Sequence, residues 1–539
     1  MASTYGVWGW GRAPADQPSE ADLAALAPLA TGLLGTPIEA PIVPAQLRPL
    51  PADRVSSRLP ASLASVTSAD EADRARHGIG RSYRDVVRAI DGVVAFAPDA
   101  VVRPADEAQM TAVLDWCASN NVAVVPFGGG TSVVGGVEPD VGDQWSGAVS
   151  LDLERLAGVI EVDATSRAAR VLAGTSGPAL EDELRPHSLT ARFYPQSFER
   201  STVGGWVATR AAGHFSAGPT HIDDLVESVR AITPAGPWES RRLPGSGAGP
   251  SPDRMLLGSE GTLGIVTETW MRLQPRPSMR WSATYAADDF AAGLEAVQAI
   301  SQSGLRPATC RLIDAGEATV TGTLATGEAP LVLGLESWHS PLDSDAATVT
   351  ELCGDHGLRL VEGGATRAEG SPSEAVSQQA VSQQAWRSSF LRAPYLREQL
   401  VLLGLVVETF ETATTWDRIA SLVADVTSRT TAALQEVCGG GTVTCRLTHI
   451  YPDGAAPYFT VIAPGRRGSE LAQWDEVKAA ASEAILASGG SITHHHAVGR
   501  DHRLWYDAQR PELFARALRG AKDALDPSGI LNPGVLLGP

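Results

Sequence analysis

Apolar residues recur with two different periods in the first half of the chain. Within residues 105–120 they follow the i, i+3, i+4, i+7 spacing of one helix face, at Met110, Val113, Leu114 and Cys117. A second, short helix is expected at residues 178–184. Short β-branched or alternating runs predict strands at residues 93–96, 122–125, 148–153 and 169–172, and another that runs through Ile232. This alternation predicts an α/β region from about residue 93 onwards.

The second half of the chain has weaker glycine signals and longer alternations of helix and strand, which predict an α+β region over residues 280–490. The apolar run at residues 400–410 predicts a buried strand, and the glycine- and proline-rich residues 241–252 predict a mobile loop. Residues 367–384, rich in Ser, Glu and Gln, predict a solvated helix or loop. With a boundary at Pro275 to Pro277, the expected segments are residues 1–90 (a mostly helical extension), 91–277, 278–495 and 496–539.

Composition narrows the class of protein. A length of 539 residues exceeds what one hydrophobic core usually organises, so two domains are expected. The formal charge of −19 argues against a nucleic-acid partner, because phosphates are neutralised by basic faces. Five cysteines without a CxxC pair favour a reduced, cytoplasmic setting over a disulfide framework. No secretion leader or long apolar span is evident, although loose contact with a membrane surface stays open.

Three segments combine glycines with hydroxyl side chains: residues 126–132 (PFGGGTS), 201–206 (STVGGW) and 258–265 (GSEGTLGI). Successive glycines allow positive φ and bring backbone N–H groups close to an anion, and Thr131 and Ser132 can donate to phosphate oxygens. An isolated GGG is equally well a plain turn. Three such loops in one chain favour a long, phosphate-containing cofactor held along its length.

The order of these loops resembles the FAD-binding domain of the vanillyl-alcohol oxidase type of flavoenzymes, and the GxGxxG fingerprint of dinucleotide folds is not evident. The resemblance implies an α+β, two-domain flavoenzyme, in which residues 91–277 bind FAD, 278–495 form an α+β cap domain over the flavin, and 496–539 return to the FAD domain. Thr131 stands where relatives with covalent flavin often have histidine, so FAD is expected without a covalent bond. The residues expected to contact it are Pro126, Phe127, Gly128, Gly129, Gly130, Thr131, Ser132, Gln196, Ser201, Thr202, Gly205, Thr209, Arg210, Glu260, Gly261, Gly264 and Ile265.

The triplet His494-His495-His496 raises the question of a metal site. Neighbours in an extended strand point to opposite faces, so only His494 and His496 would pair if the run is extended. FAD-dependent 2-hydroxy-acid dehydrogenases of this superfamily supply metal ligands from H-x-G-D-G-N-x-H and E-H-G-x-G. Here Tyr458 stands near the place of the second histidine and a histidine replaces the glutamate, which disfavours a metal-assisted reaction.

Nearly the whole chain is similar to the alkyldihydroxyacetonephosphate synthase family. The similarity includes the N-terminal WGWG, the three loops, the segments RLID, YLR, ETFET and TCRLT, and SITHHHAVG. Carried over by position, Tyr458 matches the catalytic tyrosine of that family and Arg397 its arginine for the substrate phosphate. Arg311 matches a further arginine needed for activity, and His495 and His496 match functional histidines. No metal is implied.

The resemblance implies exchange of the acyl chain of acyl-dihydroxyacetone phosphate for a long-chain fatty alcohol, through an adduct at flavin N5, in ether lipid synthesis. It also implies a homodimer, with a cytoplasmic or membrane-peripheral location. Acting as a base, Tyr458 would need nearby arginines or a histidinium to favour the tyrosinate. On residue type alone, Tyr458 also suits a core aromatic and Arg311 an ion-paired strand residue. The alternatives are an FAD-dependent 2-hydroxy-acid dehydrogenase or oxidase, and a flavin-binding protein without chemistry.

Overall fold

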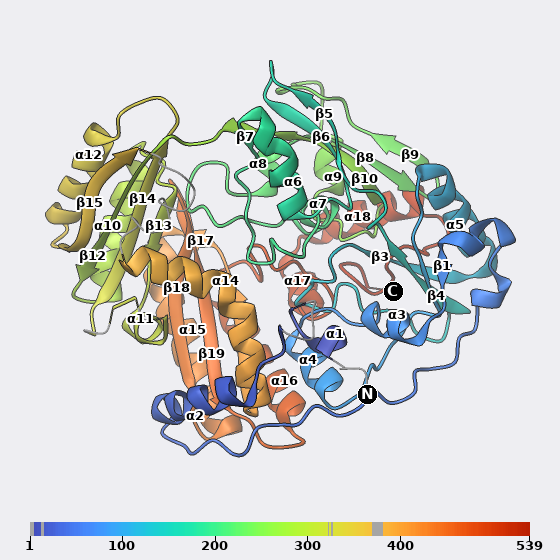
Figure 1. The fold of residues 1–539 in the computed structure, drawn as a ribbon, viewed down its shortest axis with the longest axis horizontal. Helices are drawn as coiled ribbons and strands as arrows, with labels where there is room; N and C mark the ends of the chain where they lie inside the picture. Colours follow the sequence, from blue (N-terminus) through green and yellow to red (C-terminus); the bar gives the residue numbers. More distant parts are fainter. Residues whose placement is uncertain (1–4, 12–15, 322, 325–326, 369–380, 539) are drawn as a thin grey trace.

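The computed structural model describes residues 5–11, 16–321, 323–324, 327–368 and 381–538. Two sheets lie toward one end of the molecule and two toward the other, with helices packed around and between them (Figure 1). Most of the solvated segment expected at residues 367–384 lies outside the described residues.

The first sheet has the strand order β1-β2-β4-β3, and β2, β4 and β3 run parallel. A parallel pair needs a long crossover, which α5 (Glu107–Asn120) supplies between β2 and β3. Asp106 caps this helix by accepting the N–H of Gln109 (2.8 Å), and Asn121 ends it in the left-handed region. The strands are β1 (Thr67–Ser68), β2 (Ala100–Val102), β3 (Val122–Phe127) and β4 (Gly147–Asp152).

The second sheet is antiparallel, with the order β5-β6-β10-β8-β9, and it shares one apolar core with α5 and the first sheet. Its strands are β5 (Val159–Asp163), β6 (Ala168–Leu172), β8 (Val226–Thr233), β9 (Gly236–Glu239) and β10 (Ile265–Arg272). Around it lie the pair β7 (Leu189–Thr190) and β11 (Gln274–Pro275), and the helices α6 (Gly177–Leu184), α7 (Val203–Thr209), α8 (Ile222–Leu225) and α9 (Asp253–Leu256).

The third sheet has the order β13-β14-β12-β15, and α10 and α12 share its apolar core. Its strands are β12 (Met279–Ala287), β13 (Thr309–Leu312), β14 (Ala329–Ser337) and β15 (Arg359–Ala368). The helices are α10 (Phe290–Gln302), α11 (Ala315–Thr321) and α12 (Asp343–Asp355).

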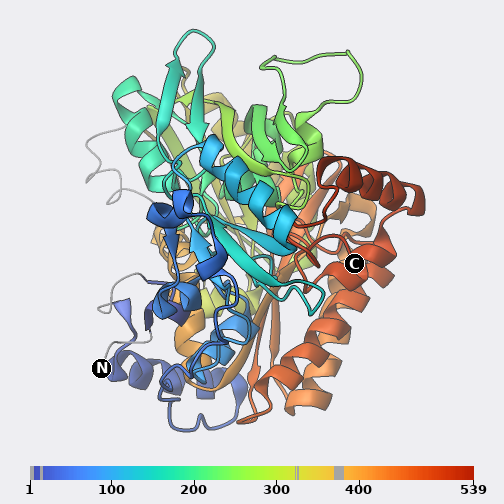
Figure 2. The same ribbon diagram turned by 90° about the vertical axis from the view of Figure 1, so that its right-hand side faces the viewer.

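The fourth sheet has β19 between β16 and β18, with the short β17 also paired to β19. Two long helices, α15 and α16, lie side by side and pack on it (Figure 2). The strands are β16 (Leu405–Glu411), β17 (Thr414–Thr415), β18 (Thr442–Tyr451) and β19 (Gly454–Pro464). The helices are α14 (Val381–Leu402), α15 (Trp416–Cys438) and α16 (Glu470–Ala487).

Both ends of the chain pack onto this framework. Trp8 is fully buried and Trp10 nearly so, so these tryptophans hold the N-terminal segment onto the body. At the other end, Asn532 N–H donates to the carbonyl of Val124 on β3 (2.8 Å), which adds the C-terminal segment to that strand. The terminal helices are α1 (Tyr5–Trp8), α2 (Glu20–Leu34), α3 (Glu71–Arg76), α4 (Tyr83–Ile90), α17 (Arg503–Gln509) and α18 (Glu512–Leu525).

Two strand predictions were wrong in instructive ways. Residues 93–96 form no strand: Val93 N–H donates to the carbonyl of Arg88 (2.8 Å), and Val94 is apolar because it packs in the core beside α4. The run at residues 400–410 is half helix, because α14 continues to Leu402 and Gly404 turns the chain (φ 79°) into β16. The helix at residues 107–120 and the strands at 122–127, 147–152 and 168–172 agree with the predictions to within two residues.

Candidate active site

One large cavity, of about 760 Å³, lies between the three glycine loops, α14 and one face of the fourth sheet. It is large enough for a drug-sized ligand or cofactor. All five residues expected to act on substrate line it: Arg311, Arg397, Tyr458, His495 and His496. So do sixteen of the seventeen residues expected to contact FAD, namely Pro126, Phe127, Gly128, Gly129, Gly130, Thr131, Ser132, Gln196, Ser201, Thr202, Gly205, Thr209, Glu260, Gly261, Gly264 and Ile265.

Arg210 is the exception, because it does not line the cavity, and its role at the cofactor stays a prediction. Its guanidinium is half exposed and binds the carboxylate of Asp223 (2.6 Å), which also pairs with Arg254. Left-handed backbone at Arg210 (φ 51°) ends α7. The residue therefore secures the segment after α7.

The glycines of the first loop serve packing more than backbone freedom. Of the three, only Gly130 has positive φ (64°). A Cβ on Gly129 would lie 2.0 Å from the carbonyl oxygen of Arg200, and one on Gly128 would lie 2.5 Å from Thr202 Oγ1. The expectation that successive glycines adopt positive φ therefore holds at one position, and the other two let the second loop pack against the first.

These loops suit a phosphate-containing cofactor. Close packing leaves backbone rather than side chains along the cavity wall, beside the hydroxyls of Thr131 and Ser132. Ser132 Oγ accepts the N–H of Gly136 (2.9 Å), which leaves its own hydrogen to donate. Asn532 Oδ1 also lines the cavity and is buried without a partner in the described protein, so it can accept a hydrogen bond from a bound group. The donor and acceptor set fits FAD.

The opposite wall of the cavity is one face of the fourth sheet. The side chains on this face form rows that cross three strands. Side chains on that face alternate with those that pack under α15 and α16. The row nearest the histidines holds Glu411, Tyr458 and Arg446 on β16, β19 and β18. The next row holds Thr409, Thr460 and Thr444, and the third Val407, Ile462 and Thr442. The wall thus changes from ionisable groups to hydroxyls and then toward apolar side chains.

Tyr458 is 4% exposed, and the guanidinium carbon of Arg446 lies 3.9 Å from its ring centroid. Burial nevertheless raises the pKa of the Tyr458 phenol above its ordinary value, because it outweighs the opposing effect of Arg446. Tyr458 therefore carries its hydrogen at neutral pH. Arg446 does lower the pKa of Tyr458, as a neighbouring cation should, but its effect is smaller than that of burial.

Arg446 is ion-paired to the buried carboxylate of Glu317 on α11. Arg311, on the neighbouring strand β13, donates to the carbonyl of His214. Burial, with Arg446 close by, lowers the pKa of the Arg311 guanidinium to about 9. A pair of buried guanidiniums therefore lies on one side of Tyr458, and Glu317 neutralises only part of their charge.

The three histidines form a turn around the carboxylate of Glu411, so the run is not extended and the condition for pairing only His494 with His496 is not met. Glu411 accepts the backbone N–H groups of His494, His495 (3.0 Å) and His496 (2.7 Å) and the hydroxyl of Thr493 (2.7 Å). Its side chain is fully buried, and the surrounding histidines and N–H groups outweigh that burial and hold its pKa well below the ordinary value. Because the backbone curls around one anion, neighbouring imidazoles share the cavity side.

Burial keeps the imidazoles of this turn neutral. It lowers the pKa of His494 and of His495 to about 3 and that of His496 to about 4, although Glu411 opposes the shift. The rings of His495 and His496 lie 6.1 and 5.5 Å from the ring of Tyr458. A histidinium beside Tyr458, the other cation expected there, is therefore absent at neutral pH in the described site.

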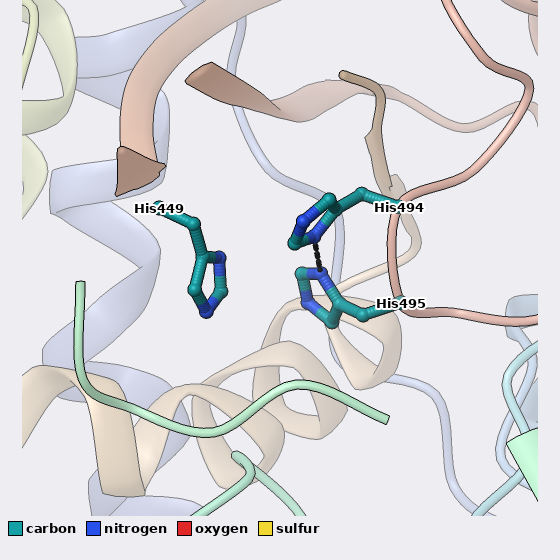
Figure 3. Close-up of side chains that lie close together, drawn as sticks. All are labelled: His449, His494 and His495. Carbon is teal, nitrogen blue, oxygen red and sulfur yellow. Dashed lines mark hydrogen bonds between the residues drawn. The ribbon is translucent and has the colours of Figure 1, made fainter. Parts of the chain in front are cut away.

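Figure 3 shows His449, on β18, facing the pair His494 and His495. Their nitrogens lie close enough together for a metal ion, and so do those of His495, His496 and Glu411. The nitrogens of His449 already contact Gly213 O (2.8 Å) and Thr448 Oγ1 (3.0 Å), and His494 contacts Tyr451 and His495. Glu411 is committed to backbone donors. A metal would have to displace these hydrogen bonds, so the geometry favours a hydrogen-bonded histidine cluster.

Arg397 comes from α14 on the other side of the cavity. Its Nη2 donates to the carbonyl of Arg81 (2.6 Å), while its Nε is buried without a hydrogen-bond partner in the described part of the chain. Arg81 is 4% exposed, and burial together with Arg200 and Arg397 lowers its pKa to about 9. Repulsion among these guanidiniums favours binding of an anion.

Several residues of the site were not among those predicted. From the sequence, Glu411 and Arg446 stood out only as parts of ETFET and TCRLT, two segments that are similar in the family, and they were given no role. In the structure both residues flank Tyr458. Trp10 lines the cavity as well, and its backbone N–H donates to the carboxylate of Glu398. The strand pattern held the usable signal for Glu411 and Arg446, because both lie on the face of the sheet that carries Tyr458.

The buried histidines make stability depend on pH. Burial lowers the pKa of His502, which does not line the cavity, to about 3, and its Nδ1 contacts Ala497 O (2.9 Å). The unfolded chain takes up a proton there near pH 6.5 while the folded protein does not, so this contribution to stability is lost as pH falls from about 6.5 toward 4. Buried acids with raised pKa, such as Glu260 and Asp501, have the opposite slope.

The prediction is therefore a difference between two proteins. Between pH 7 and pH 5.5, the free energy of unfolding of the wild type should fall by about 1 kcal/mol more than that of His502→Asn, because the full slope of about 1.4 kcal/mol per pH unit applies only below the unfolded pKa of about 6.5. Denaturant titrations of both proteins at the two pH values measure it. A difference between them that is the same at both pH values would show that His502 is not held neutral.

Comparisons with known proteins agree with this architecture. A family model described as FAD binding domain matches residues 98–240, and one described as FAD linked oxidases, C-terminal domain, matches residues 276–536. Alkyldihydroxyacetonephosphate synthase of Dictyostelium discoideum is 28% identical over 477 residues, which is 87% of this chain and 78% of the relative. That of Caenorhabditis elegans is 29% identical over 481 residues, 85% and 79% of the two chains.

Solved structures show the same fold. One of alkyldihydroxyacetonephosphate synthase superposes with a TM-score of 0.77 at 24% identity, covering 95% of this chain and 92% of that one. Another, of p-cresol methylhydroxylase, gives 0.64 at 13% identity, covering 87% and 93%. These matches identify the chain as a two-domain, FAD-dependent enzyme that is homologous to alkyldihydroxyacetonephosphate synthase.

Proposed function

We propose that this enzyme exchanges the acyl chain of acyl-dihydroxyacetone phosphate for a long-chain fatty alcohol. The observation that carries the proposal is the arrangement of the cavity. Tyr458, His495 and His496 meet beside the glycine loops, Arg397 stands across from them, and the intervening wall becomes apolar. A substrate with a charged head, a reacting centre and a long apolar chain matches these three parts.

The phosphate of the substrate would bind at Arg397. Its unpartnered Nε and the nearby guanidiniums of Arg81 and Arg200 gain from a dianion, because each buried positive charge otherwise repels the others. Planar guanidinium donors bind two phosphate oxygens at once. Binding of the phosphate at Arg397 would fix the reacting carbon of the substrate near the three glycine loops.

The alkyl and acyl chains would lie along the apolar part of the cavity. The side chains that form it come from α11, α14 and the fourth sheet: Val320, Pro394, Leu396, Leu400, Val407 and Ile462. Burial of a methylene contributes about 0.8 kcal/mol, so a long chain binds tightly to such a wall. No helix in the described part of the chain is long and apolar enough to cross a bilayer.

At the reacting centre, the protonation states assign complementary roles. Tyr458 keeps its hydrogen and can donate it to an oxygen that gains negative charge, whereas the neutral imidazole of His495 can accept the hydroxyl proton of the alcohol. Arg446, held by Glu317 over the face of Tyr458, stabilises negative charge that develops on the phenol oxygen. Bound FAD would supply a ring nitrogen able to bond to carbon, with no net oxidation.

Three further features are part of the proposal. FAD is held without a covalent bond, since Thr131 offers no attachment group at its position in the cavity wall. The enzyme forms a homodimer and contacts a membrane surface, where its lipid substrates reside. Acid precipitation tests the first of these, and should leave the flavin in the supernatant.

The function is tested by incubating the purified holoenzyme with acyl-dihydroxyacetone phosphate and a labelled long-chain alcohol, without any electron acceptor. The label should enter an ether product, with one fatty acid released for each ether formed. A heat-denatured sample serves as the control. Absence of labelled ether at all alcohol chain lengths, while FAD remains bound, would overturn the proposal.

A further inference from the structure

A hydrogen-bonded path continues behind His495, away from the cavity. His495 Nδ1 lies 2.9 Å from His494 Nδ1, the contact drawn as a dashed line in Figure 3. The other nitrogen of His494, Nε2, lies 2.7 Å from the hydroxyl of Tyr451. Both distances are those of good hydrogen bonds. From the sequence, His494 was considered only as a metal ligand and Tyr451 was given no role, and neither residue lines the cavity.

Tyr451 carries this path toward solvent. It is the last residue of β18, partly exposed, and it is followed by the exposed Pro452 and Asp453. Burial raises the pKa of the Tyr451 phenol to about 12, so the hydroxyl keeps its hydrogen. The three groups therefore link the cavity wall to the edge of the protein.

The two contacts are coupled by simple hydrogen counting. A neutral imidazole carries one N–H, and the two Nδ1 atoms share a single hydrogen between them. If Tyr451 donates to His494, then His494 donates to His495, and His495 presents Nε2–H to the cavity. If Tyr451 accepts instead, both rings reverse and His495 presents the lone pair of Nε2. A hydroxyl allows both arrangements because it both donates and accepts.

The proposed exchange needs such a path. In it the alcohol loses its hydroxyl proton, a bond forms between its oxygen and the substrate carbon, and the acyl carboxylate leaves with the electron pair of the broken C–O bond. One proton is therefore released in each turnover, inside a buried site. Resting on the proposed function, we infer that His494 and Tyr451 pass this proton from His495 to solvent.

In each passage His495 Nε2 takes the alcohol proton and its Nδ1–H moves to His494 Nδ1. The Nε2–H of His494 then moves to the oxygen of Tyr451, whose own hydrogen leaves to water. Glu411, bonded to the N–H of His494, favours a passing imidazolium, while burial and the nearby His221 and Arg210 oppose it. His449, 4.8 Å from His494 between ring centroids, is itself held neutral by burial, which lowers its pKa. Because these effects oppose one another, His494 passes a proton on and does not hold it as a stable imidazolium.

The first test replaces the hydroxyl alone. Tyr451→Phe should lower kcat for ether formation by about tenfold or more, with KM for both substrates unchanged, because the site that binds them is intact. The loss in kcat should become smaller as the buffer concentration rises, because small buffer molecules can carry the proton in place of Tyr451. Tyr285→Phe, which removes a hydroxyl bonded to Thr350 (2.9 Å) in the third sheet, is the matched control and should retain wild-type kcat. Wild-type kcat in Tyr451→Phe would overturn the inference.

The second test needs no turnover, so it separates this inference from the proposed function. In the holoenzyme labelled with ¹⁵N-histidine, the ring signals of His495 report its tautomer, with assignments from single His→Gln variants. Tyr451→Phe should shift the His495 signals, although the Tyr451 hydroxyl lies against His494 and Thr220 and not against His495. Unchanged His495 signals would show that the two rings are not coupled. Absence of ether formation by the wild type together with shifted signals would reject the proposed function and keep the coupled path.

Discussion

Tyr458→Phe should lower kcat for ether formation by about 10²- to 10⁴-fold while FAD stays bound. The hydroxyl belongs to β19, the strand between β16 and β18, and it lies between Glu411 and Arg446. Positioned acid–base groups contribute rate factors of this size. The phenyl ring still fills the space under the Arg446 guanidinium, so the variant changes chemistry more than packing. Steady-state rates and the flavin-to-protein absorbance ratio measure both parts of the prediction.

Tyr83→Phe provides the comparison for this loss. Tyr83 is 1% exposed, and its hydroxyl donates to Leu405 O (3.0 Å) at the start of β16, outside the cavity. Tyr83→Phe should lower the free energy of unfolding by about as much as Tyr458→Phe does, and it should keep wild-type kcat. Equal activity in wild type and Tyr458→Phe, with FAD bound in both, would remove Tyr458 from the reaction.

Glu411→Gln should disorganise the histidine turn, with a loss of about 3 kcal/mol in the free energy of unfolding and at least about 100-fold in kcat. An amide keeps one acceptor, but its NH₂ group faces backbone N–H groups of residues 494–496 that the carboxylate now satisfies. Displacement of His495 and His496 by about 1 Å is enough for a loss of this size. Denaturant titration and steady-state kinetics give the two values.

A neighbouring buried carboxylate separates stability from activity. Glu408 lies on the opposite face of β16, where it binds Lys478 (2.8 Å) and Trp474 Nε1 (2.6 Å) under α16. Glu408→Gln should destabilise the protein comparably and leave kcat unchanged. If both variants lose activity in proportion to stability, Glu411 has no particular link to the histidines.

The residues expected at the cofactor can be found in the sequence because most of them come from short runs of consecutive residues. A loop such as Gly128 to Ser132 carries its glycines and hydroxyls side by side, and the three loops all line the cavity. Arg210 does not line it, and its side chain binds Asp223, thirteen positions later. No local pattern shows which of two partners an arginine takes.

The substrate side depends on pairings that are distant in sequence. Glu411 acts through backbone N–H groups 83 to 85 residues later, which are invisible in residue types. The balance between burial and Arg446 at Tyr458 also depends on packing, and burial has the larger effect on the pKa of the phenol. The apolar runs were ambiguous for a related reason, because Leu400 to Leu402 pack equally well from a helix or from a strand.

The absorption spectrum of the bound flavin during anaerobic turnover tests the proposed transferase reaction most directly. With acyl-dihydroxyacetone phosphate and a fatty alcohol, the enzyme should form ether continuously and its FAD should return to the oxidised spectrum without any acceptor. With 2-hydroxy acids the spectrum should not change. Bleaching of the flavin by a 2-hydroxy acid, reversed only when an acceptor is added, would contradict the account and identify a dehydrogenase.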